Sequence, residues 1–451
     1  MKILLLILLQ VPSYLAATTL RVPGEYGTIQ AAVDAAMPGD TVEVSEGTYR
    51  ERITLKPELI LRSAGDGAPG EHGLLRAERT IMDGRGPGDA PGVRMAEGAV
   101  LDGFTITGVG RYDALAWKKA HAAQGEGQSH EHIGAFGVPG VGAENVTSRI
   151  INNIVHHNGF TGIALSGADN QSLVKSNRCY RNMGGGIGAM DGCKAEIRGN
   201  TCYENFFAGI GHAGADTYVI DNICYANIRA GIGISEGASP LVVSNRCYRN
   251  RRAGIGIRTG EATRPELRGN ECYLNDMSGI GIKERAEPIL VGNHCYSNTL
   301  AGIGAQLDAS PRIENNILHD NVLAGIGLSA TEHGQAWIRG NRVFDHPVPA
   351  LAIQSGWKVV VEDNDFSRAE GLPPVIMVFA GAEGIFTGNR IKGPGVAGIR
   401  VGGRAVIRGN RLDGLQVRKG GPPHYGVWVL EGGKVEEREN VFMNWREKVH
   451  R

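Results

Sequence analysis

The chain has 451 residues, and its 47 lysine and arginine residues are matched by 47 aspartate and glutamate residues. This balance argues against nucleic acid or an anionic membrane surface as a partner, because both recruit strongly basic proteins. Glycine, at 67 residues, is about twice as frequent as in an average protein, whereas phenylalanine occurs only 10 times. The composition therefore favours many short strands and turns over packed helices.

The N-terminus predicts a signal peptide over residues 1–17. A single lysine precedes an apolar run that ends in the small residues of Leu15-Ala16-Ala17. The run is shorter than the stretch that a transmembrane helix normally needs. The alternatives to a signal peptide are a buried N-terminal strand and an uncleaved anchor. No other segment could cross a bilayer, so we expect no membrane span after signal removal and a secreted or periplasmic protein.

Residues 18–63 are predicted to form an N-terminal cap with the first strands. In "TIQAAVDAAMPGD" (28–40) the apolar residues recur at helical spacing, and Pro38-Gly39 ends the helix. The strand patterns "TVEVSEGTY" and "RITLKPELILRSAG" follow at once. A short capping helix suits a stacked-strand protein, because open strand edges otherwise invite aggregation.

Residues 64–450 are predicted to form the body of the protein, in which one asparagine recurs every 21 to 25 residues. The members of this column are Asn153, Asn177, Asn200, Asn222, Asn245, Asn270, Asn293, Asn316, Asn341, Asn364, Asn389 and Asn410. A second column consists of Asn158, Asn182, Asn205, Asn227, Asn250, Asn275, Asn298 and Asn321. A period in the twenties with β-rich content predicts a solenoid.

Each repeat reads as three short strands separated by asparagine turns. In 264–282 these strands are "RPELR", "ECYL" and "SGIGI". Stacked coils bring equivalent asparagines about 4.8 Å apart, close enough to hydrogen-bond along the column. We therefore predict an all-β, right-handed parallel β-helix of about a dozen coils.

Recurring isoleucines and cysteines are expected to fill the interior of the predicted rod. Six cysteines share one repeat position, and Val155, Leu318 and Val343 take that position in other coils. Replacement by valine and leucine favours packed thiols; disulfides and a thiolate metal column are the alternatives.

The chain resembles the pectin-lyase-like group of β-helix proteins. The resemblance is carried by "TIQAAVDAAMPGDTVEVSEGTYRERITL", by "VLDGFTITG" (100–108) and by the later repeats, and it covers nearly the whole mature chain. It implies a right-handed parallel β-helix and a carbohydrate-directed function. The motifs of pectinesterases, polygalacturonases and pectate lyases are not present as sets, so no specific enzyme family is matched.

Glycine pairs flank the inward isoleucine of each third strand and predict a bare strip of backbone along the rod. The pairs are Gly186/Gly188, Gly209/Gly211, Gly231/Gly233, Gly254/Gly256, Gly279/Gly281, Gly302/Gly304 and Gly325/Gly327. An extended polymer could approach such a strip closely. The alternative is that glycine eases packing or sharp bends.

The coils diverge just beyond this strip, where four of them carry charged residues. The candidate catalytic residues are Glu236, Arg258, Lys283 and Glu284, and the candidate substrate-binding residues there are Arg285, Gln306 and Asp308. Glu236 and Glu284 lie two coils apart, about 9.6 Å between backbones, close to the spacing of inverting glycosidases. The alternative is an inert, solvated ladder of surface charges.

An insertion at 111–131, "RYDALAWKKAHAAQGEGQSHE", interrupts the coil that precedes "HIGAFGV". We expect it to lie beside the glycine strip, with Trp117 stacking on a sugar ring and Lys118 pairing with acidic groups. His130 and His132 point the same way on an extended segment, and His121 is nearby, but an H-x-H pattern is a weak metal signal. No metal site is assigned, and the cofactor is unknown.

The leading hypothesis is an exported β-helix protein that binds or processes a polysaccharide or other glycan along the glycine-lined face. As an enzyme it would be a lyase, an epimerase or a glycoside hydrolase. Two other classes stay open: a non-catalytic periplasmic scaffold or metal-handling maturation factor, and a structural or adhesive surface rod. The oligomeric state is left open.

Overall fold

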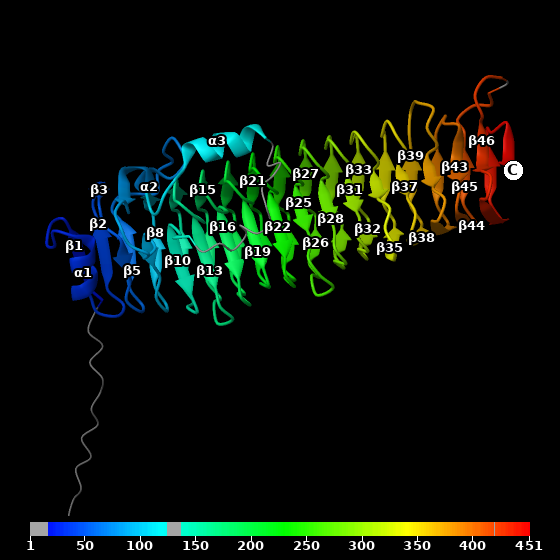
Figure 1. Cartoon of the computed structure of the whole chain (residues 1–451). Helices are drawn as coiled ribbons and strands as arrows, with labels where there is room; N and C mark the ends of the chain where they lie inside the picture. The colour runs from blue at the N-terminus through cyan, green and yellow to red at the C-terminus, as the bar shows by residue number, and fades with distance from the viewer. Residues whose placement is uncertain (1–16, 124–136, 419) are drawn as a thin grey trace, which may run out of the picture.

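The computed structural model describes residues 17–123, 137–418 and 420–451. The predicted signal peptide, apart from Ala17, lies outside these ranges. The described chain forms one elongated rod in which three parallel sheets run along its length (Figure 1). None of the helices in the described ranges has the length and apolar character needed to cross a bilayer.

Sheet A has 17 strands and contains the first strand of each coil. Its strands are β1 (Thr19–Val22), β2 (Thr41–Val44), β5 (Ile60–Ser63), β8 (Val100–Asp102), β11 (Arg149–Ile151), β14 (Leu173–Lys175), β17 (Glu196–Arg198), β20 (Tyr218–Ile220), β23 (Leu241–Val243), β26 (Glu266–Arg268), β29 (Ile289–Val291), β32 (Arg312–Glu314), β35 (Gly334–Arg339), β38 (Trp357–Glu362), β41 (Glu383–Thr387), β44 (Arg404–Arg408) and β47 (Lys434–Arg438).

Sheet B has 16 strands and contains the second strand of each coil. Its strands are β3 (Gly47–Tyr49), β6 (Thr80–Asp83), β9 (Thr105–Thr107), β12 (Ile154–His156), β15 (Arg178–Tyr180), β18 (Thr201–Tyr203), β21 (Ile223–Tyr225), β24 (Arg246–Tyr248), β27 (Glu271–Tyr273), β30 (His294–Tyr296), β33 (Ile317–His319), β36 (Arg342–Phe344), β39 (Asp365–Ser367), β42 (Arg390–Lys392), β45 (Arg411–Asp413) and β48 (Val441–Met443).

Sheet C also has 16 strands and contains the third strand of each coil. Its strands are β4 (Ile53–Thr54), β7 (Val93–Arg94), β10 (Val141–Glu144), β13 (Ile163–Ser166), β16 (Ile187–Met190), β19 (Ile210–Ala213), β22 (Ile232–Ser235), β25 (Ile255–Ile257), β28 (Ile280–Ile282), β31 (Ile303–Ala305), β34 (Ile326–Leu328), β37 (Leu351–Ile353), β40 (Ile376–Val378), β43 (Ala397–Val401), β46 (Tyr425–Val429) and β49 (Glu447–His450).

The parallel β-helix is confirmed, but the coil count is larger than predicted. The asparagine columns begin at Asn153, so counting them missed the N-terminal coils, which reach the same register without asparagine. Sheets of 16 and 17 strands at about 4.8 Å per coil make a rod of roughly 80 Å.

The asparagine columns hold the turns together as the spacing predicted. Asn245 donates from its backbone N and from Nδ2 to Asn270 Oδ1, at 3.0 Å each, and Nδ2 also donates to Val219 O at 2.8 Å. The residue before it, Ser244, has φ 54°, which makes the bend sharp. Each buried amide therefore satisfies two backbone groups of the preceding coil and hydrogen-bonds to the asparagine side chain of the next coil.

The N-terminal end is covered by helix α1 (Ile29–Ala35). Thr28 caps it by accepting a hydrogen bond from Ala31 N, and Ile29, Ala32 and Val33 are buried against the first coils. This confirms the predicted capping helix, and its strands β1, β2 and β5 belong to the same sheet as the later coils. A second short helix, α2 (Leu75–Arg79), precedes β6.

The insertion predicted at 111–131 contains helix α3 (Ala114–Ala122), which lies against the side of the rod (Figure 1). Asp113 caps this helix by accepting hydrogen bonds from Leu115 N and Ala116 N. His130 and His132 lie outside the described residues, so the expectation that they could bind a metal stays untested.

Candidate functional site

The two glycine columns of sheet C have different surroundings, and only one of them faces outward. A Cβ atom at Gly254 would lie 2.7 Å from Gly279 O and 2.9 Å from Asn275 Nδ2. The column made of Gly186, Gly209, Gly231, Gly254, Gly279, Gly302 and Gly325 is buried, and a side chain there would collide with the next coil. The prediction that both glycines of each pair line an open strip is therefore half wrong.

The second column forms the outward strip. It consists of Gly188, Gly211, Gly233, Gly256, Gly281, Gly304 and Gly327, which pair in register across sheet C and are half-buried. We call these seven residues the glycine strip. Among the described residues, a Cβ atom at Gly211 would meet nothing within 4 Å, and one at Gly233, Gly256 or Gly281 would meet only an alanine Cβ at 3.5 Å.

Cationic side chains lie on both sides of the middle of this strip. Arg229 and Arg252 precede strands β22 and β25, whereas Arg258 and Lys283 follow β25 and β28. Burial lowers the pKa of Arg229 to about 10, and the neighbouring charges of Arg252 and Arg258 act in the same direction. Burial also lowers the pKa of Arg252 and of Arg258. Three partly desolvated guanidinium groups therefore gather on the coils of Gly233 and Gly256.

The predicted carboxylates are brought to this cluster by a column of turns. Glu236, Thr259 and Glu284 occupy equivalent positions with φ near 60° on three successive coils. Glu236 N donates to Thr259 Oγ1 at 2.8 Å, and Thr259 N donates to Glu284 Oε2 at 3.0 Å. The Glu284 carboxylate thus reaches back by one coil.

This reach changes the predicted geometry of the two carboxylates. The spacing of about 9.6 Å applies to the backbones of Glu236 and Glu284, whereas the Glu284 carboxylate lies beside the intervening coil. Both carboxylates act on the charge of Arg258, which therefore lies within their electrostatic range. Glu236 is exposed, and Lys283 is half-buried on the coil beyond Arg258.

The other residues predicted on these coils have turn or surface roles. Arg285 pairs with Glu261 at 3.2 Å, and both side chains are exposed. Asp308 Oδ1 accepts hydrogen bonds from Thr331 Oγ1, Glu332 N and His333 N, and these bonds hold the pKa of Asp308 below its usual value. Asp308 Oδ1 therefore stabilises a turn, and its assignment to substrate binding stays a prediction. Gln306 occupies the outward position of the coil after Lys283 and is half-buried.

Trp117 is buried, which contradicts its predicted role as a sugar-stacking platform. Its side chain donates from Nε1 to Glu204 O at 2.8 Å, and the residue is 9% exposed. Arg181 lies 5.2 Å from the ring centroid, and His121 stacks on the ring at 4.9 Å. The indole therefore anchors α3 to the turns between sheets B and C, because apolar burial and the hydrogen bond both favour docking.

Lys118, the neighbour of Trp117, is exposed on α3. His121, which lies near the H-x-H motif in the sequence, contacts Arg251 at 3.2 Å. Among the described residues, no three histidine, cysteine, aspartate or glutamate side chains come together in a way that could hold a metal ion.

His212 and the cysteine column have structural roles. The His212 ring contacts Gly233 O at 3.1 Å and Thr217 Oγ1 at 2.8 Å, and burial lowers its pKa to about 4. All seven cysteines are free and buried, and burial raises the pKa of Cys202, Cys224, Cys247 and Cys295. The packed-thiol interpretation is confirmed, and the disulfide alternative is wrong.

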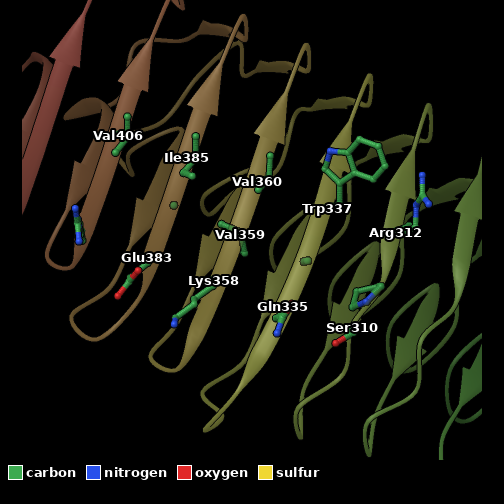
Figure 2. A pocket seen from close by; sticks show the side chains of 14 residues that line it. Ser310, Arg312, Gln335, Trp337, Lys358, Val359, Val360, Glu383, Ile385 and Val406 are labelled. Carbon is green, nitrogen blue, oxygen red and sulfur yellow. The ribbon is translucent and has the colours of Figure 1, made fainter. Parts of the chain in front are cut away.

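Sheet A carries a shallow trough of about 590 Å³ that sequence reasoning missed (Figure 2). Trp337, Val360, Ile385 and Val406 form one row along it, and Gln335, Lys358 and Glu383 form a second row beside them. Arg312 covers one face of the Trp337 ring at 4.4 Å. The sequence did contain a signal for this trough, because four successive strands of sheet A carry an apolar residue at the same outward position.

Sequence comparison places more than half of the chain in one family. A family model described as "Right handed beta helix region" matches residues 131–262 and, in an overlapping alignment, residues 208–366. No curated protein sequence matches the chain.

Solved structures with similar architecture share little sequence with the chain. The periplasmic alginate epimerase AlgG is 12% identical, with 68% of this chain and 77% of that chain covered and a TM-score of 0.42. The A-module of the Azotobacter vinelandii mannuronan C-5 epimerase AlgE4 is 14% identical, with 94% and 92% covered and a TM-score of 0.31. Pectate lyase Pel9A is 14% identical, with 77% and 72% covered and a TM-score of 0.32. At such identities, any function must be argued from this chain's own residues.

Proposed function

We propose, from the premise that the chain belongs to the right-handed β-helix family, that it binds an anionic polysaccharide along the glycine strip of sheet C. The polymer would lie across successive coils, over Gly211, Gly233, Gly256 and Gly281. Its carboxylates or sulfates would pair with Arg258 and Lys283 on one side and with Arg252 on the other.

The observation that carries this proposal is that packing within the described residues does not need glycine at Gly211, Gly233, Gly256 or Gly281. A side chain at Gly256 would make only an ordinary contact with Ala230, whereas two residues earlier, at Gly254, it would collide with a carbonyl oxygen. Glycine costs stability in a strand, because it loses more conformational freedom on folding. A repeated glycine at open positions therefore favours a function that needs bare backbone, such as close approach of a polymer.

The cationic residues beside the glycine strip favour an anionic polymer over a neutral one. Four cationic residues lie on the coils beside the strip, and two glutamates lie at one side of it. The cations are Arg229, Arg252, Arg258 and Lys283, and the glutamates are Glu236 and Glu284. A flexible anionic chain gains from several such contacts along one line, and these contacts weaken as salt is added. The rod is also long enough to contact several sugar units at once, at about 4.8 Å per coil.

Processing of the same polymer is the second candidate function. It is favoured by the position of Glu236, an exposed carboxylate within electrostatic range of the Arg258 guanidinium. A carboxylate can abstract a proton beside a uronate carboxyl group, and a neighbouring cation can stabilise the negative charge that develops. In this proposal Glu236 acts as the base, Arg258 and Lys283 hold the uronate, and Glu284 positions Arg258.

The predicted signal peptide over residues 1–17 supports export, and we place the protein outside the cytoplasm, secreted or periplasmic. A polysaccharide partner would be encountered there. A structural rod or a scaffold is the alternative if no glycan binds.

A panel of polyuronates, sulfated glycans and neutral glucans tests the proposal, with both retention and product release scored. Arg258→Ala and Lys283→Ala should each weaken polyuronate binding by about tenfold or more. Gly256→Val should also weaken it, by filling the strip. Lys358→Ala, which removes a cation from the sheet A trough, is the matched control and should bind normally. Equal binding by all four variants would refute the site, and loss in Lys358→Ala alone would move it to the trough.

Glu236→Gln separates binding from catalysis. If Glu236 is a base, this variant should retain the polymer and lose product release. If the parent protein releases no product from any polymer, the protein is a binding module and the catalytic candidate is wrong.

A further inference from the structure

Two histidines on the outer face of sheet B come within hydrogen-bond distance of each other. His294 is the first residue of β30, and His319 is the last residue of β33, on the next coil. In the register of the sheet His294 pairs with Ile317, and Tyr296 pairs with His319, so the two histidines are diagonal neighbours. Their Nε2 atoms are 2.8 Å apart.

The second nitrogen of His319 is held by a carboxylate. His319 Nδ1 lies 2.7 Å from Asp320 Oδ2, and a carboxylate can only accept, so Nδ1 carries the proton. The lone pair of His319 then lies on Nε2, and His294 Nε2–H donates to it. A carboxylate behind a histidine in this way is the usual support of a metal-binding imidazole, because it fixes the tautomer and raises the basicity of the ligand.

Neighbouring rings hold both imidazoles in place. His319 stacks between Tyr296, at 5.1 Å, and Phe344, at 4.9 Å. His294 lies against Tyr296 at 4.6 Å. Six stacked tyrosines continue this aromatic column towards the N-terminus: Tyr180, Tyr203, Tyr225, Tyr248, Tyr273 and Tyr296. The pair is therefore preorganised on a rigid surface and open to solvent, with the His319 side chain 20% exposed.

We propose that His294 and His319 form a surface site for a divalent transition metal ion, with Cu²⁺ preferred. The ion would bind both Nε2 atoms after the rings rotate about their terminal torsions, and the proton on His294 Nε2 would pass through solvent to His294 Nδ1, so that both ligands stay neutral imidazoles. Water would fill the remaining coordination positions. The site is separate from the glycine strip and does not depend on the proposed function.

The separation of the two hydrogen-bonded nitrogens matches adjacent ligands of a square plane more closely than two ligands of a tetrahedron, so a small ring rotation would suffice for tetragonal coordination. With metal–nitrogen bonds of about 2.0 Å, two adjacent ligands of a square plane are about 2.8 Å apart, whereas two ligands of a tetrahedron are about 3.3 Å apart. The observed separation is 2.8 Å. Cu²⁺ prefers the tetragonal arrangement, and it is also the strongest binder of the first-row divalent series.

Glu271, the nearest carboxylate on the preceding coil, is already engaged. It accepts from Tyr296 Oη at 2.9 Å and pairs with Arg246 at 3.1 Å. We therefore assign two protein ligands and no third. A two-nitrogen site with open positions exchanges its ion with solvent, unlike a closed structural site.

Titration of the purified, chelator-stripped full chain with Cu²⁺ alone tests this site, followed by electron paramagnetic resonance. The background carries His130→Ala and His132→Ala, so that the H-x-H motif does not contribute. The parent should bind one Cu²⁺ at this site with a spectrum of two imidazole nitrogens, and Zn²⁺ should bind more weakly.

His319→Phe and His294→Ile should remove that binding without harming the fold, because phenylalanine and isoleucine occupy the same positions in neighbouring coils at Phe344 and Ile317. Asp320→Asn should weaken binding by about tenfold. His333→Ala, which removes a lone exposed histidine, should change neither affinity nor spectrum. An unchanged two-nitrogen spectrum in His319→Phe, or a preference for Zn²⁺ over Cu²⁺, would overturn the proposal.

Discussion

Adding one methyl group at two glycines of the same strand should have opposite effects on stability. At Gly254 the new Cβ would lie 2.7 Å from Gly279 O and 3.0 Å from Cys272 Cβ, and neither neighbour can move without disturbing its coil. Overpacking of this kind costs about 1–3 kcal/mol. At Gly256 the nearest atom would be Ala230 Cβ at 3.5 Å, an ordinary van der Waals contact. Gly256→Ala should therefore stabilise the protein by about 0.5–1 kcal/mol, the cost of glycine in a strand.

Urea denaturation of Gly254→Ala and Gly256→Ala, followed by circular dichroism, measures both effects with one chemical change. A large solenoid can unfold in stages, so the comparison uses midpoints at equal slope, supported by hydrogen exchange of the amides in β25. We expect a lower midpoint for Gly254→Ala and a higher one for Gly256→Ala. A loss of 1 kcal/mol or more in Gly256→Ala would mean that the fold requires the strip glycines, and the argument for a polymer site would lose its support.

Three further outcomes follow from the interior of the rod. His212 has a pKa of about 4 when folded, against an ordinary value of 6.5, so only the unfolded chain gains a proton at this residue between these values. His212 should therefore lower the unfolding free energy by about 3 kcal/mol as pH drops from 6.5 to 4, in addition to the contribution of groups such as His156, whose pKa burial also lowers to about 4. Urea midpoints across pH should show a dependence smaller by this amount in His212→Ile, and an equal dependence in the two proteins would contradict the prediction. Cys247 should resist thiol reagents in the folded protein and react after denaturation, and Cys247→Val should fold normally; rapid labelling of the native protein would contradict its burial. Asn250→Ala should lower the unfolding free energy by about 3 kcal/mol or more, because it removes the side-chain hydrogen bonds to Asn227 N, Cys224 O and Asn275 Oδ1. A thermal melt equal to that of the parent would contradict the stabilising role of the asparagine column.

The sequence alone predicted the architecture because a solenoid repeats the same residue types and the same contacts in every coil. Asparagine, cysteine and isoleucine recur at one spacing, and each has the same neighbours on every coil, so a contact inferred once applies many times. The predicted count of about a dozen coils was too low, because the N-terminal coils form the same sheets without the asparagine signal.

The site could be predicted only in part. The strip glycines and the charges beyond them follow from strand alternation, which tells an outward residue from an inward one. Alternation could not separate Gly254 from Gly256, because that difference depends on how closely the next coil approaches. It also could not show that Glu284 reaches back to the coil of Thr259, since a side chain's direction depends on the donors near it.

Features that break the repeat were decided by tertiary structure. Trp117 lies in an insertion with no periodicity, and only the docking of α3 reveals that its ring is buried beside Glu204, 87 residues away. His294 and His319 are 25 residues apart and occupy different repeat positions, so no single column joins them. Their contact arises because adjacent coils bring diagonal outward positions within reach of two long side chains. A repeating sequence determines what is the same in every coil, whereas chemistry between unlike residues depends on the stacking that places them together.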